Sequence, residues 1–98
     1  DNDMSEQIIY LNGKAFRDWR TFAKELKRVL CLDDSVNVLN ANVLNDVLYG
    51  GYGILSYRVP YTIVWRNFQR CKKVIPEDVL AEMCALFLDN PYITLVYE

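Results

Sequence analysis

The side chains that most often catalyse reactions are few in this chain. There is no histidine, so the commonest general base at neutral pH is missing, as is the usual partner of a cysteine nucleophile. Asp33 and Asp34 are adjacent acids, a pattern more typical of turns and helix caps than of a catalytic dyad. The glycine-rich residues 50–53 (GGYG) lack the terminal Lys-Ser/Thr of a P-loop. We therefore predict a binding module and not an enzyme, with no cofactor and no metal.

Polar side chains at helical spacing are the best candidates for contact with a partner. In residues 36–49 the apolar positions repeat every four residues, as Val43 and Val47, and Leu44 and Leu48. Asn42 and Asp46 are then one turn apart, with Asn45 beside them, on the face away from the leucines. For Asp46 the alternative is a solvated helix residue. For the two asparagines it is a capping role near the helix start.

A turn-forming loop follows this segment. Gly50 and Gly51 are expected to stop the helix, because glycine is the usual residue past a helix end. Tyr49 and Tyr52 flank that stop and are candidates for interface anchors. Packing of these two rings on their own core is the alternative, in a chain with 7 tyrosines.

Strands are expected to alternate with helices along the chain. The predicted strands are residues 7–11, 61–65 and 92–97, each rich in β-branched and aromatic residues. An amphipathic helix carries an apolar stripe from Phe16 to Leu30 and is broken at residues 33–35. The helix in residues 36–49 has its N-cap at Asn37 or Asn40, residues 66–73 form a short helix or loop, and Pro76 is the first residue of a last helix. This order predicts an α/β fold with a three-stranded parallel sheet covered by three to four helices.

Length and composition favour one domain over residues 1–98, with residues 1–3 as a short extension or scar before Met4. The apolar content of 52% is sufficient for a packed core, and no apolar run reaches membrane-spanning length. The spacing of the three cysteines fits neither a disulfide framework nor a zinc site: Cys84 is expected in the core, and Cys31 and Cys71 are expected to be partly exposed. A cytoplasmic location is the simplest expectation.

Charge is unevenly distributed, although the net charge is only −2. Residues 29–57 contain no lysine or arginine but include Asp33, Asp34 and Asp46, while the basic residues cluster in residues 14–28 and 66–73. The net charge argues against nucleic acid or an anionic membrane as the partner. The asymmetry is compatible with an acidic docking surface and equally with ordinary surface variation.

Four segments that together span nearly the whole chain carry a family resemblance: residues 9–13 (IYLNG), 40–50 (NANVLNDVLYG), 60–68 (PYTIVWRNF) and 93–95 (ITL). In this order they resemble the barstar family, the intracellular inhibitors of secreted ribonucleases. The GGYG loop resembles a subgroup whose members are taken to be immunity proteins for bacterial toxins.

The resemblance implies a parallel sheet under helices, no cofactor, and a monomer that forms a 1:1 complex with a basic ribonuclease or toxin. In that family the second helix and the loop before it enter the enzyme's cleft. Asp46 matches the second of the two aspartates in the family's binding helix, Gly50 matches the glycine at the end of that helix, and Asp89 matches a peripheral acidic position. The resemblance also predicts a cis bond between Val59 and Pro60.

The sequence departs from the family pattern in the binding segment. Asn42 replaces an aspartate, Asn45 a tryptophan, and residues 36–38 a tyrosine-rich loop. Neither amide can carry the charge of a phosphate mimic, so the family's best-known extracellular ribonuclease is expected to be inhibited poorly. An interaction domain that kept the scaffold for a non-nuclease partner is the second hypothesis, and a small enzyme of unknown type is the third.

Overall fold

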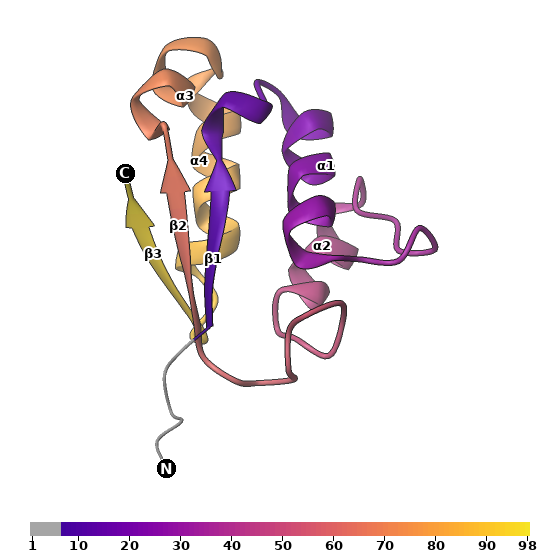
Figure 1. Cartoon of the computed structure of the whole chain (residues 1–98). Helices are drawn as coiled ribbons and strands as arrows, with labels where there is room; N and C mark the ends of the chain where they lie inside the picture. Colours follow the sequence, from indigo (N-terminus) through magenta and orange to yellow (C-terminus); the bar gives the residue numbers. More distant parts are fainter. Residues whose placement is uncertain (1–6) are drawn as a thin grey trace.

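A three-stranded parallel sheet organises the molecule (Figure 1). The structure, a computed structural model, describes residues 7–98, so the expected extension before Met4 lies outside the described part. The strands β1 (Gln7–Asn12), β2 (Tyr61–Arg66) and β3 (Ile93–Tyr97) pair in that order, with Ile63 opposite both Ile9 and Leu95. The helices are α1 (Trp19–Leu30), α2 (Ala41–Val47), α3 (Phe68–Val74) and α4 (Glu77–Leu88). The predicted α/β fold is confirmed.

The helices cover one face of the sheet. Alternate residues of the strands point to opposite faces, so burial identifies the covered one. Ile9, Ile63 and Trp65 are buried against apolar residues of α1, α2 and α4, whereas Ile8 and Tyr10 on the opposite face are about half exposed. One hydrophobic core therefore lies between the sheet and the helix layer.

Helix α1 has well-defined ends. At its start the Asp18 carboxylate accepts a hydrogen bond from the Thr21 N–H, and the Thr21 hydroxyl oxygen accepts one from the Asp18 N–H. It ends at Cys31, whose left-handed backbone (φ 55°) lets the Leu32 N–H reach the Lys27 carbonyl. The helix thus stops before the acidic residues that were expected to break it.

The three thiols differ in exposure. Cys31 is exposed, as predicted. The prediction for Cys71 was wrong, because its sulfur lies in the core 3.4 Å from the Trp65 indole nitrogen, which donates to it. Burial accordingly raises the pKa of the Cys71 thiol. Cys84 packs against the core but is only half-buried.

Two predicted details of the loops and helix starts are wrong. The Val59–Pro60 bond is trans. The loop between α2 and β2 instead reverses at Arg58, where a left-handed backbone (φ 57°) lets the Arg58 N–H donate to the Tyr49 carbonyl at 2.8 Å. Pro76 precedes α4 as its N-cap rather than forming its first residue, although Glu77 and Asp78 do lie in the first turn. Residues 66–73, left open as helix or loop, contribute most of α3.

Candidate functional site

Helix α2 presents a polar stripe to solvent. Asn40, one of the two predicted caps, accepts hydrogen bonds from the Asn42 and Val43 N–H groups through its side-chain oxygen, which starts the helix there. Leu44 and Val47 are buried in the core. The opposite face consists of exposed residues at helical spacing, namely Asn42, Asn45 and Asp46. The predicted orientation of these three side chains is therefore the observed one.

Four predicted residues meet at the C-terminal end of α2. Asp46, Tyr49, Gly50 and Tyr52 line a depression of about 790 Å³, together with Gly51, Tyr57 and Arg58. Within residues 7–98 the Asp46 carboxylate has neither a hydrogen bond nor an ion pair. A carboxylate in this state has all its acceptor positions available to a partner. We call this depression the α2–loop site.

The loop that completes the α2–loop site is held by close backbone contacts. Gly50 (φ 100°) lies so near the Ser56 carbonyl that an added Cβ would come within 2.1 Å of its oxygen. At Gly53 the corresponding distance to the Leu30 carbonyl oxygen would be 2.0 Å, and the adjacent Ile54 N–H donates to that oxygen at 3.0 Å. Glycine is thus required at both positions, and the loop is fixed to the end of α1.

Tyr57 and Arg58 belong to the site but were not predicted. The Tyr57 ring is 63% exposed, and the Arg58 guanidinium carbon lies 5.3 Å from its centroid. Arg58 is the first basic residue after the base-free stretch, and the Tyr49–Arg58 backbone hydrogen bond returns it to the end of α2. The α2–loop site consequently contains both signs of charge. The signal available in the sequence was the position of Arg58 only nine residues beyond the predicted helical segment 36–49.

A second depression lies between α2 and α4. It has a volume of about 450 Å³ and is lined by Trp19, Ala41, Asn45, Glu82, Ala85, Leu86 and Asp89. Two predicted residues, Asn45 and Asp89, are therefore neighbours here and not in the α2–loop site. Glu82 was missed, although its spacing of seven residues from Asp89 on one helix is a signal that places the two on the same face. We call this depression the α2–α4 groove.

Asn42, Asp33 and Asp34 line neither depression. Asn42 is exposed on α2. Asp34 forms an ion pair with Lys27 at 2.6 Å and lines a separate depression over α1. Asp33 accepts a hydrogen bond from the Ser35 N–H at 2.8 Å, and this bond lowers the pKa of the Asp33 carboxyl. The structure therefore does not bring these two aspartates together with Asp46.

The described residues form no cluster of metal ligands. No group of three or more cysteine, aspartate or glutamate side chains there is close enough to hold a metal ion. No helix in the described part of the chain is long and apolar enough to cross a bilayer. The geometry of the α2–loop site and of the α2–α4 groove, with exposed amides, carboxylates and tyrosines on a fixed backbone, is suited to contact with another macromolecule.

Neither a protein-family model nor a curated protein sequence matches the chain.

Proposed function

We propose that this protein is an inhibitor, or immunity protein, that blocks the active-site cleft of a basic ribonuclease or ribonuclease-like toxin. The observation that carries the proposal is the unpaired Asp46 carboxylate, exposed on α2 beside a loop fixed by Gly50 and Gly53. A cleft that binds RNA presents cationic side chains to phosphate oxygens, and a carboxylate can take the place of those oxygens. The resemblance to the barstar family supports the use of α2 for binding, because in that family the second helix enters the enzyme's cleft.

The remaining side chains of the α2–loop site are suited to a cleft built for nucleotides. Tyr52 and Tyr57 are exposed and lie beside Asp46 in one depression, where their rings can pack on a partner at little entropic cost. Asn42 and Asn45 donate and accept hydrogen bonds but carry no charge. The complex is expected to be 1:1, with a monomeric inhibitor acting in the cytoplasm of a bacterium.

Arg58 and the two asparagines restrict which enzyme can be the partner. A cleft lined only by arginine and lysine would meet a cation at Arg58 and uncharged amides at Asn42 and Asn45. Buried cations without a counter-charge cost several kcal/mol. The partner's cleft should therefore have a polar or acidic group opposite Arg58, and Asn42→Asp should improve inhibition of the family's best-known extracellular ribonuclease.

A second candidate is an interaction domain that uses the same surface on a partner without nuclease activity. The α2–α4 groove favours this alternative, because Trp19 and Leu86 give it an apolar wall beside the carboxylates of Glu82 and Asp89. Such a groove suits a cationic or amphipathic segment of any protein and does not require a nucleotide-binding cleft.

Affinity capture followed by an activity assay distinguishes the two candidates. The protein is immobilised, a lysate of the source organism is passed over it, and the captured protein is purified and incubated with RNA. We expect a basic protein that degrades RNA and loses this activity at one equivalent of the inhibitor. An acidic or inactive captured protein, or RNA degradation that persists with excess inhibitor, would favour the interaction-domain alternative.

A further inference from the structure

A basic depression lies at the carboxyl ends of β1 and β2. It has a volume of about 430 Å³ and is lined by Tyr10, Leu11, Asn12, Lys14, Arg28, Arg66 and Asn67. These strand ends are at the opposite end of the molecule from the loop that follows α2 (Figure 1).

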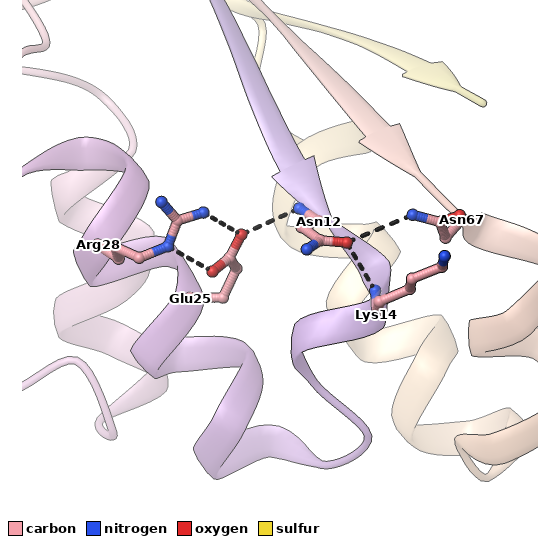
Figure 2. A network of polar contacts seen from close by, with 5 residues as sticks. All are labelled: Asn12, Lys14, Glu25, Arg28 and Asn67. Atoms are coloured by element: carbon pink, nitrogen blue, oxygen red, sulfur yellow. Dashed lines mark hydrogen bonds and ion pairs between the residues drawn. The ribbon is translucent and has the colours of Figure 1, made fainter.

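A buried carboxylate holds Arg28 in this depression (Figure 2). The Glu25 side chain is only 3% exposed. It accepts hydrogen bonds from the Arg28 Nε at 2.9 Å, from the Arg28 Nη2 at 2.8 Å and from the Asn12 N–H at 3.0 Å. Because Glu25 uses Nε and Nη2, the Arg28 Nη1 is left with no bond to any residue in the described part and can donate to a ligand.

Asn12 fixes the backbone around the same depression. Its side-chain oxygen accepts hydrogen bonds from the Lys14 N–H at 2.9 Å and from the Asn67 Nδ2 at 3.3 Å (Figure 2). Asn67 has a left-handed backbone (φ 60°) directly after β2. With the Asn12 oxygen occupied, the depression offers a ligand mainly hydrogen-bond donors.

Arg66 and Lys14 complete the set of cations. The Arg66 Nε donates to Glu98 at 3.0 Å, and its guanidinium carbon lies 4.2 Å from the centroid of the Tyr10 ring. Neither Nη of Arg66 nor the Lys14 ammonium is bonded within residues 7–98. Three cations against the carboxylates of Glu25 and Glu98 leave a net charge of +1 in an otherwise acidic protein.

We infer that this depression binds a phosphate group, either free or as the monoester of a small molecule. A phosphate has only acceptor oxygens at its charged end, and guanidinium groups match its geometry with parallel hydrogen bonds. Arg28 and Arg66, each held by a carboxylate, and the unbonded Lys14 ammonium supply the donors that line the depression. The site is independent of the proposed inhibitory surface, since it uses none of the same residues.

Nuclear magnetic resonance titration tests the inference. Inorganic phosphate and adenosine 5′-monophosphate are added separately to the 15N-labelled protein, with sodium chloride at matched ionic strength as the control. We expect saturable shifts of the amides of Asn12, Lys14 and Asn67 with either phosphate compound and not with chloride. Tighter binding of the nucleotide would identify a monoester as the ligand, and equal binding would identify free phosphate.

Variants assign the binding to these side chains. Lys14→Ala and Arg66→Ala should each raise the dissociation constant for inorganic phosphate by about fivefold, as expected for loss of one charged contact. Arg58→Asn is the matched control, because it removes the same charge from a depression that shares no lining residue with this one, and asparagine accepts the left-handed backbone at that position. Shifts that do not saturate, or an equal loss of affinity in Arg58→Asn, would overturn the inference.

Discussion

Gly50 and Gly51 allow the rigidity of the α2–loop site to be tested with a matched pair of variants. Both have positive φ angles, 100° and 87°, that strain any residue with a Cβ. They differ in space: a Cβ at Gly51 would meet the Tyr57 side chain at 3.6 Å, an ordinary contact, whereas one at Gly50 would lie 2.1 Å from the Ser56 carbonyl oxygen. Gly51→Ala therefore measures backbone strain alone, and Gly50→Ala adds a backbone clash.

The difference in unfolding free energy follows from the contacts that the clash breaks. Strain from an alanine at positive φ costs about 1–2 kcal/mol in either variant. To relieve the clash at Gly50, the Ser56 carbonyl must move by about 1.3 Å to reach an ordinary contact distance of 3.4 Å. Such a shift disrupts the neighbouring bonds from the Gly51 N–H to the Leu55 carbonyl and from the Arg58 N–H to the Tyr49 carbonyl. At about 1 kcal/mol each, their loss makes Gly50→Ala about 2 kcal/mol less stable than Gly51→Ala.

Urea denaturation followed by circular dichroism measures this difference. In a domain of this size, 2 kcal/mol corresponds to a difference in Tm of about 8–16 °C. We expect Gly50→Ala to have the lower denaturation midpoint with an unchanged slope. Equal midpoints for the two variants would refute the argument that close packing against Ser56 fixes the loop.

Three further predictions concern buried groups and charge. Glu25→Ala should lower the unfolding free energy by about 2–4 kcal/mol in chemical denaturation, because it removes three hydrogen bonds from a buried carboxylate; a change below 1 kcal/mol would show that the network adds little. Iodoacetamide at about pH 8 should label Cys31 first, because burial raises the pKa of the Cys71 and Cys84 thiols and leaves less thiolate at those two residues. Mass spectrometry measures the order of labelling, and faster labelling of Cys71 would contradict its burial. Association with the partner should slow by about tenfold between about 0.05 and 0.5 M salt in stopped-flow measurements, and a salt-independent rate would exclude electrostatic steering.

Local patterns in the sequence were sufficient for the sheet, the helices and the exposed face of α2. Residues 61–65 are a continuous β-rich apolar run, and in the structure four of these five residues are buried in the central strand β2. Val43 and Val47, like Leu44 and Leu48, are four residues apart, about one helical turn. This spacing alone places Asp46 and both asparagines on the outer face of the helix. These features depend on periodicity alone.

Features that depend on contacts distant in sequence were not predicted. Cys71 looked exposed in a basic segment, but the indole of Trp65 and the Gly13 carbonyl surround its sulfur. Arg58 enters the α2–loop site because the loop between α2 and β2 turns back at Arg58 itself, which has a left-handed backbone, while the Val59–Pro60 bond stays trans. Asp89 and Asp46 line different depressions, because the position of Asp89 depends on how α4 packs, which spacing along one helix does not specify.

Binding of Asp46→Ala to the cognate partner is the most direct test of the proposed function. If the Asp46 carboxylate pairs with a cation inside the partner's cleft, its removal should weaken binding by roughly 2–5 kcal/mol in isothermal titration calorimetry. Asp78→Ala, which removes an exposed acid from the first turn of α4, is the control and should bind like the wild type. Binding of Asp46→Ala with unchanged affinity would contradict the proposal that α2 blocks the cleft.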